Sequence, residues 1–187
     1  MAPLPSSPPL HAGSDAAVVA ATCAAHGLSL SEFAALRSAA VAAKTVAYCP
    51  YSRFRVGAAL LPADTDNSSS SSSSSSSAGG DGAPAVIKGC NVENASYPVG
   101  MCAERVGFGA AAAQGVTRFK ALAVATDISP PASPCGMCRQ AIREFCMSDM
   151  PIIMFDKNED YVVLTVEEIL PMSFGPDQLP PAGAPGT

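Results

Sequence analysis

The sequence predicts an α/β protein of three layers, α/β/α, with helices on both faces of a single mixed sheet of about five strands. Apolar runs of strand length alternate with longer segments that carry one apolar face. The strand runs are almost wholly apolar, which is typical of strands covered on both faces. The 187 residues, 48% of them hydrophobic, are enough for one domain with a sizeable core.

One domain and two tails account for the chain. Residues 1–27 are rich in proline and alanine, and we expect them to be largely disordered because they bury too little apolar area to offset their ordering entropy. A short helix over residues 16–25 is the alternative. The domain spans residues 28–179, and residues 180–187 form a second disordered tail. Residues 67–82, which contain ten consecutive serines, are expected to be a flexible, disordered insertion.

The predicted order of elements is α-β-β-α-β-α-β-β with a final helical turn. A capping serine, Ser29 or Ser31, begins the first helix. The next two strands flank the serine-rich insertion, so they are expected to form a hairpin with an enlarged tip. The expected helices lie at about 29–43, 101–114 and 135–145, the strands at 54–61, 85–91, 119–125, 151–155 and 161–164, and the turn at 166–170.

Charge and cysteine content narrow the functional classes. Sixteen acidic against eleven basic residues give a net charge of −5, and no basic run occurs, which argues against a nucleic-acid partner. Secretory signals and transit peptides need basic residues near the N-terminus, but no lysine or arginine precedes Arg37. The apolar run at residues 16–25 is too short to span a membrane. Seven cysteines, an odd number, indicate thiols and metal ligands. We expect a cytoplasmic protein that binds neither nucleic acid nor membrane.

Three cysteines predict a metal site. Cys135 and Cys138 have the two-residue gap that lets both sulfurs bind one ion, usually Zn²⁺. Cys102 and Cys135 each begin a predicted helix, where the helix dipole favours the thiolate. Three ligands leave a fourth position for water, which is typical of catalytic zinc. Four further cysteines could close the site, but none has partner spacing and buried thiols are expected: Cys23, Cys49, Cys90 and Cys146.

Glu104 and Arg105 stand beside Cys102. Zinc with an adjacent carboxylate activates water, so Glu104 is the candidate proton carrier, although alone it would be interpreted as complementing the helix dipole. Residues two apart on a helix point in nearly opposite directions, so the zinc must lie beyond the helix end. Three thiolates leave a net −1 on Zn²⁺, and Arg105 is expected to compensate it. The alternative for Arg105 is a solvated or interface residue.

Together with other motifs, these residues resemble the small homotetrameric cytidine deaminase family. The resemblance covers about residues 28–179 and excludes the tails and the serine-rich insertion, where the family has a compact hairpin. It is carried by Tyr48-Cys49-Pro50-Tyr51-Ser52-Arg53-Phe54, Gly89-Cys90-Asn91-Val92-Glu93-Asn94-Ala95, Tyr97-Pro98, Cys102-Ala103-Glu104-Arg105, Pro134-Cys135-Gly136-Met137-Cys138 and Phe174-Gly175-Pro176.

The resemblance implies zinc-dependent deamination of cytidine and 2′-deoxycytidine to uridine and 2′-deoxyuridine, with release of ammonia, in pyrimidine salvage. Cys102, Cys135 and Cys138 would hold one zinc ion per subunit. Glu104 would deprotonate the attacking water, protonate N3 and pass a proton to the leaving amine. Phe174 would reach a neighbouring subunit's site in a homotetramer with shared active sites. The implied substrate-binding residues are Phe54, Asn91, Glu93, Ala95, Tyr97, Ala103 and Phe174.

Two other classes of function are open from the sequence. A zinc-stabilised binding module would have a closed metal site and no dependence on Glu104. A deaminase with a different substrate is the second alternative. A polynucleotide-editing enzyme would need a basic channel, which the net charge of −5 disfavours. Deaminases of blasticidin-type antibiotics are related, but Asn91, Glu93 and Phe174 favour a nucleoside.

Overall fold

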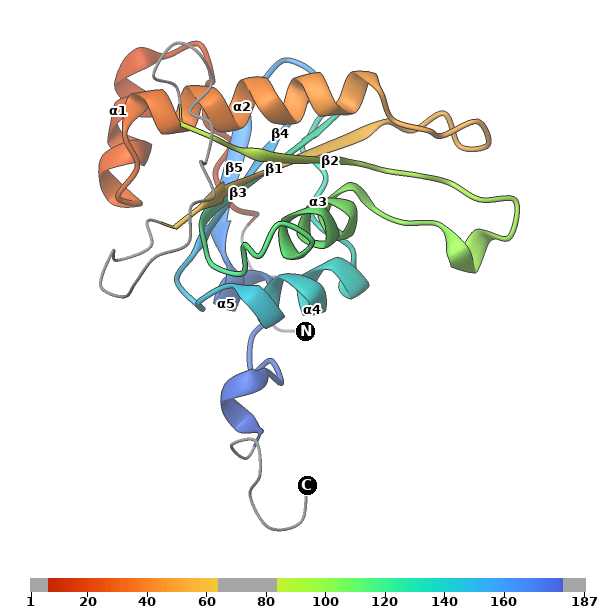
Figure 1. Cartoon of the computed structure of the whole chain (residues 1–187). Coiled ribbons are helices and arrows are strands. Elements are labelled where there is room, and N and C mark those ends of the chain that lie inside the picture. The colour runs from red at the N-terminus through yellow and green to blue at the C-terminus, as the bar shows by residue number, and fades with distance from the viewer. Residues whose placement is uncertain (1–6, 64–83, 180–187) are drawn as a thin grey trace, which may run out of the picture.

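A single five-stranded sheet lies at the centre of the computed structural model, which describes residues 7–63 and 84–179 (Figure 1). The strand order is β2-β1-β3-β4-β5, and β3 and β4 are parallel while the other neighbours are antiparallel. The predicted mixed α/β sheet is therefore confirmed. The strands are β1 (Val56–Pro62), β2 (Ile87–Cys90), β3 (Phe119–Thr126), β4 (Pro151–Phe155) and β5 (Tyr161–Thr165).

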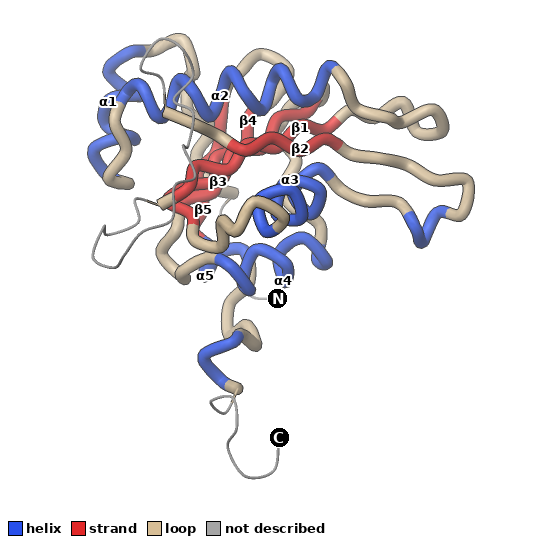
Figure 2. The backbone as a smooth tube through the Cα atoms, in the orientation of Figure 1, coloured by secondary structure: helices blue, strands red, loops and turns tan. Residues whose placement is uncertain are grey.

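Helices cover both faces of the sheet and make the predicted three layers (Figure 2). Side chains alternate along β3, so Leu122 and Val124 pack in the core with α3 and α4, while Ala121 and Ala123 pack in the core with α2. The small alanines let α2 lie close to the sheet. The helices are α1 (Ala16–Ala25), α2 (Leu30–Thr45), α3 (Ala103–Ala112), α4 (Gly136–Phe145) and α5 (Val166–Ile169).

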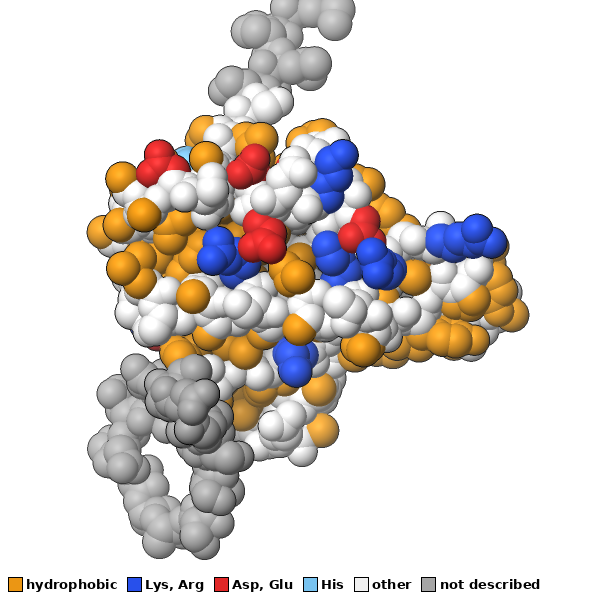
Figure 3. Space-filling view, turned by 90° about the horizontal axis from the view of Figure 1, so that it is seen from above, with side chains coloured by type: hydrophobic (Ala, Val, Ile, Leu, Met, Phe, Trp, Pro, Cys, Tyr) orange, Lys and Arg blue, Asp and Glu red, His pale blue; other side chains and the backbone are white. Residues whose placement is uncertain are grey.

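Helix α2 begins with a reciprocal capping box. The Ser29 hydroxyl accepts from the Glu32 N–H, and the Glu32 carboxylate accepts from the Ser29 N–H. On the face seen from the α2 side, basic side chains lie among acidic ones (Figure 3), and Lys120 pairs with Glu32 at 2.7 Å. Across residues 7–63 and 84–179, no helix by itself has the length and apolar content to cross a membrane. The α1–α2 pair, bent by 105°, does meet that test of length and composition.

The N-terminal segment differs from the predicted, largely disordered tail. From residue 7 onward it is described, and α1 forms with Asp15 as its N-cap. The hydroxyls of Thr22 and Tyr161 share a buried hydrogen bond of 2.8 Å. His11 also pairs with Tyr161 through two backbone hydrogen bonds, of 2.8 and 2.9 Å. The alternative prediction, a short helix over residues 16–25, is confirmed, and this segment is ordered by tertiary contacts with the edge strand β5, which composition does not reveal.

The predicted hairpin of β1 and β2 is confirmed. The two strands are antiparallel, with Gly57 opposite Cys90 and Leu60 opposite Ile87. The predicted insertion at 67–82 and the predicted tail at 180–187 lie outside the described residues. The open end of this hairpin, together with the starts of α3 and α4, surrounds the candidate site.

Candidate active site

Three cysteine sulfurs converge where α3 and α4 begin. Cys102 and Cys135 are the N-caps of these helices, both with extended backbone, and Cys138 lies in the first turn of α4. The three Sγ atoms lie within 4.8 Å of one another, and those of Cys102 and Cys135 are 3.7 Å apart. Tetrahedral zinc with Zn–S distances of about 2.3 Å requires sulfurs about 3.8 Å apart. The cluster therefore fits a zinc ion with three protein ligands and one open position.

The pKa values of Cys102 and Cys138 are shifted in opposite directions. Hydrogen bonds with Cys138, Arg105 and Cys135, together with the charge of Arg105, outweigh the effect of burial and lower the pKa of Cys102 to about 5. The hydrogen bond between Cys102 and Cys138, together with burial, raises the pKa of Cys138. Of these two cysteines, Cys102, at the start of α3, therefore forms the thiolate more readily.

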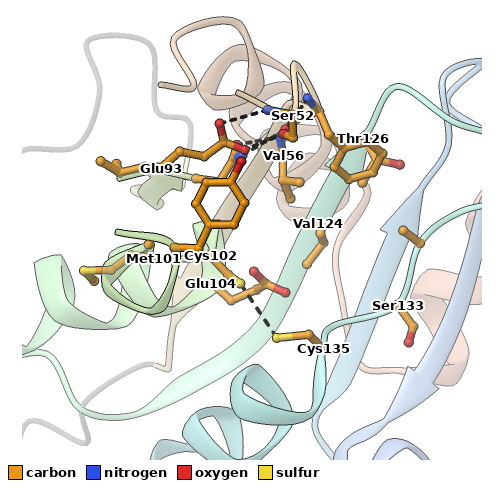
Figure 4. A pocket seen from close by; sticks show the side chains of 16 residues that line it. Ser52, Val56, Glu93, Met101, Cys102, Glu104, Val124, Thr126, Ser133 and Cys135 are labelled. Carbon is orange, nitrogen blue, oxygen red and sulfur yellow. Dashed lines mark hydrogen bonds between the residues drawn. The ribbon is translucent and has the colours of Figure 1, made fainter. Parts of the chain in front are cut away.

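Glu104 is the buried carboxyl group of this site, with 4% of its surface exposed. It is the second residue of α3, and its side chain lines the same pocket as Cys102 and Cys135 (Figure 4). The side chains of Cys102 and Glu104 therefore both face the pocket at the start of α3. Burial raises the pKa of Glu104, and negative charge at Cys102 raises it further. A carboxyl group with a raised pKa is suited to both accepting and donating a proton near neutral pH.

Arg105, in the first turn of α3, interacts with the cysteine cluster. Its Nη2 donates to the Gly100 carbonyl at 3.1 Å, and its buried Nε has no hydrogen-bond partner among the residues that the structure describes. Although burial alone would lower it, interaction with the Cys102 and Cys138 sulfurs raises the pKa of Arg105. A positive charge is thus placed beside the thiolates. Charge compensation of a bound metal by Arg105 stays a prediction.

A pocket of about 430 Å³ extends from the cysteines toward the loops after α2 and β2. This volume is within the range of small-molecule sites. At one end are Cys102, Glu104 and Cys135, and at the other is the Glu93 carboxylate (Figure 4). The predicted substrate-binding residues that line the pocket are Phe54, Asn91, Glu93 and Tyr97.

Glu93 is held by the loop that follows α2. Its carboxylate accepts from the Ser52 hydroxyl and from the backbone N–H groups of Tyr51, at 2.9 Å, and Ser52, at 3.2 Å. The Ser52 hydroxyl and these N–H groups lower the pKa of Glu93. Glu93 therefore presents an ionised, oriented acceptor at the end of the pocket far from the cysteines.

Three other predicted binding residues do not line this pocket. Ala95 is exposed in the loop after β2, and Ala103, the first residue of α3, is wholly buried in the core. Phe174 is 59% exposed in the C-terminal segment, where its carbonyl accepts from Gln140 at 3.0 Å. The proposed contact between Phe174 and a neighbouring subunit stays a prediction.

Several pocket residues were not predicted from the sequence, among them Ser52, Met101, Thr126 and Ser133. Ser52 lies within a recognised motif, but its bond to Glu93 joins residues far apart in the chain. Thr126 ends β3, so strand alternation puts its side chain on the same face as Val124, which also lines the pocket. That alternation was the available signal for Thr126. The only sequence signal that Ser133 lines the pocket was that it lies two residues before Cys135.

Comparison with known proteins gives consistent matches. A family model described as the cytidine and deoxycytidylate deaminase zinc-binding region matches residues 80–154. A cytidine deaminase of Sporosarcina psychrophila is 41% identical over 137 residues, which are 73% of this chain and 87% of the relative. One of Halalkalibacterium halodurans is 38% identical over 135 residues, 72% of this chain and 88% of the relative. A crystal structure of cytidine deaminase from Burkholderia pseudomallei matches with a TM-score of 0.63 and 36% identity, covering 75% of this chain and 98% of that one.

Proposed function

This chain belongs to the cytidine deaminase family, and we propose that it deaminates cytidine and 2′-deoxycytidine to uridine and 2′-deoxyuridine in pyrimidine salvage. The observation that carries the proposal is the position of one buried carboxyl group, Glu104, in the same pocket as a three-cysteine cluster. A closed structural zinc site would have four protein ligands and would need no such carboxyl group.

Cys102, Cys135 and Cys138 would hold one zinc ion per subunit, since their sulfur spacing fits three corners of a tetrahedron. Bound zinc would supply Lewis acidity, which lowers the pKa of a water molecule in the open fourth position. Arg105 would offset the excess negative charge of three thiolates, because its guanidinium lies against Cys102 and Cys138.

Glu104 would carry the protons of the reaction. It would accept a proton from the water that attacks C4 of the pyrimidine, and it would donate that proton to ring N3. The hydroxyl group now on C4 would give its proton through Glu104 to the amine, which leaves as ammonia as the C4–N bond breaks and the C4 carbonyl of the product forms. Burial of Glu104 supports this role, because it raises the pKa toward the range in which both protonation states are accessible.

The far end of the pocket would bind the sugar. The Glu93 carboxylate, fixed by Ser52, is a suitable acceptor for a ribose hydroxyl. Asn91 lies beside it and has one amide hydrogen not used by the Phe54 carbonyl. Phe54 would pack on the pyrimidine ring. Ala95, Tyr97 and Ala103 are proposed to contact the nucleoside through the loop after β2 and the start of α3.

Assembly and location are further parts of the proposal. Apolar side chains protrude from the loop that ends at α3, including Tyr97, Val99 and Met101, and they support a homotetramer with shared sites. Phe174 would enter a neighbouring subunit's site from the exposed C-terminal segment. All seven cysteines lie within the described residues and none forms a disulfide, which supports a reducing cytoplasmic location.

The direct test combines cytidine turnover, followed by absorbance, with zinc content on the same sample. Glu104→Gln keeps the shape of the side chain but removes its proton transfer. We expect this variant to retain zinc and to lose about 100- to 10,000-fold in kcat. Unchanged turnover in Glu104→Gln would refute the mechanism. Zinc without any turnover in the wild type would instead favour a binding module.

A further inference from the structure

Arg139 joins three segments of the chain through one guanidinium group. Its Nε donates to the Pro134 carbonyl at 2.8 Å, and its Nη2 donates to the Ser133 hydroxyl at 2.6 Å. On the other side, Nη1 donates to the Ile169 carbonyl, at the end of α5, at 2.8 Å. The planar, forked guanidinium can reach three acceptors at once, whereas a lysine ammonium is a single point charge. Arg139 thus ties the segment before α4 to α5.

The segment held by Arg139 has few other hydrogen bonds. The loop over residues 127–134 contains three prolines, which lack a backbone N–H. Between residues 128 and 134, the described structure has one backbone hydrogen bond, from the Lys157 N–H to the Ile128 carbonyl. The Ser133 hydroxyl also contacts the Pro134 carbonyl, but at 3.5 Å. Arg139 therefore supplies the main hydrogen bonds at the end of this loop nearest the site.

That end of the loop forms part of the site. Ser133 and Cys135 line the pocket on the side away from Glu93 (Figure 4). Cys135 follows Pro134 directly, and its Sγ lies 3.7 Å from that of Cys102. A shift of the Pro134 peptide would move a metal ligand and the pocket wall together. Displacements of about 1 Å in such groups can reduce catalysis by about 100-fold.

We infer that Arg139 is a positioning residue that holds Ser133 and Pro134, and through them the metal ligand Cys135, in the geometry that the reaction requires. It acts through these residues and makes no contact with the substrate. Its side chain is anchored at the Ile169 carbonyl, so α5 sets the position of the guanidinium. A purely electrostatic role near the cysteines would survive replacement by lysine, but the forked geometry would not.

The test compares Arg139→Lys and Arg139→Ala with a matched control, Arg37→Lys. Arg37 also donates to a backbone carbonyl, that of Gly13 at 3.2 Å, but it lies on α2, on the opposite face of the sheet from the cysteine cluster. Two quantities are measured on the zinc-loaded proteins: the rate of zinc release to a chromogenic chelator, and kcat and KM for cytidine. Thermal unfolding is recorded for each variant.

We expect Arg139→Lys to unfold near the wild-type temperature, yet to release zinc at least fivefold faster and to lose at least tenfold in kcat/KM. Arg139→Ala should lose more, and methylguanidinium in solution should restore part of its kcat. Arg37→Lys should stay within twofold of the wild type on both measures. If Arg139→Lys also stays within twofold on both, the inference is wrong, whether or not Arg139→Ala folds.

The activity measurement rests on the proposed function, but the zinc-release measurement does not. If the wild-type protein binds zinc and does not turn over cytidine, the proposed function fails while the release rates still test Arg139. If the wild type is active and Arg139→Lys releases zinc at the wild-type rate with unchanged kcat/KM, the proposed function stands and the inference fails.

Discussion

Asn91 and Val56 are joined by two hydrogen bonds, one from each residue's backbone N–H. The Asn91 N–H donates to the Val56 carbonyl at 3.2 Å, and the Val56 N–H donates to the side-chain Oδ1 of Asn91 at 2.8 Å. The Asn91 Nδ2 also donates to the Phe54 carbonyl at 2.8 Å. At the pocket end of β1, the Asn91 side-chain amide thereby makes the two hydrogen bonds that the backbone of a neighbouring strand would otherwise make. Asn91 positions Phe54 as well as facing the pocket.

Asn91→Asp tests this double role. The carboxylate can still accept from the Val56 N–H, but it cannot donate to the Phe54 carbonyl, and two oxygens then face each other. We expect a loss of about 1–3 kcal/mol in the free energy of unfolding and at least a tenfold rise in KM for cytidine. Urea unfolding and steady-state kinetics measure the two effects. A rise in KM with unchanged stability would mean that Asn91 serves the substrate alone.

Asp127 gives a pH-dependent contribution to stability. Burial alone would raise the pKa of Asp127, but hydrogen bonds and charge from Arg55 and Lys44 outweigh it and lower the pKa. The ion-pair distances are 2.7 and 2.9 Å. Because the folded-state pKa lies below the unfolded value, the stabilisation is fully present above about pH 5. It is lost as the pH falls through about 4 toward the folded-state pKa.

We therefore expect Asp127→Asn to be about 1 kcal/mol less stable than the wild type near pH 7. The difference should shrink as the pH falls below about 4, since the wild-type carboxylate then becomes protonated. Urea unfolding at a series of pH values measures it. Asp149→Asn is the control, because Asp149 is exposed and has no hydrogen bond or ion pair within residues 7–63 and 84–179. A difference between Asp127→Asn and wild type that is constant with pH would contradict the assignment.

Deletion of residues 67–82 should leave kcat/KM for cytidine within twofold of the wild-type value. The pocket lies at the Val56 end of β1, whereas the insertion joins the strands at the Pro62 end, about 20 Å away at about 3.3 Å per residue. Shortening the connection about threefold should add about 1 kcal/mol to the free energy of unfolding. Kinetics and urea unfolding of the deletion variant test both statements. A large loss of activity would show that the insertion contacts a site or an interface.

The sheet and the cysteine cluster were predictable because their signals are local. β4 begins and ends as predicted, at Pro151 and Phe155, since an apolar run between turn residues defines it. The spacing of Cys135 and Cys138, with each cysteine-bearing segment opening a helix, was enough to predict the cluster. The expectation that Cys102 and Glu104 share a site at the end of α3, rather than on its flank, followed from helix geometry, and both side chains line the pocket there.

The contacts that hold the site residues in place were less predictable, because each joins two residues that are far apart in the sequence and share no motif or spacing. The Glu93 carboxylate accepts a hydrogen bond from the Ser52 hydroxyl, and Arg139 donates one to the Ile169 carbonyl. In each pair, other helices or strands lie between the two residues in the sequence. A polar side chain at such a position has many possible partners, and the fold decides among them. The same reason explains α1, whose residue Thr22 is ordered by a hydroxyl on β5. Amino-acid composition indicates whether a segment tends to be ordered by itself, but it does not show which part of the fold the segment packs against.

The pairing of His11 with Tyr161 also bears on how copies of the chain can associate. An edge strand with unpaired N–H and C=O groups is a template for a strand from another molecule, and sheets that extend in this way form open-ended aggregates. His11 uses both backbone groups of Tyr161 within the same chain. Tyr161, the first residue of β5, is therefore closed to pairing with a strand from another molecule, so the N-terminal segment also shields this part of the sheet edge.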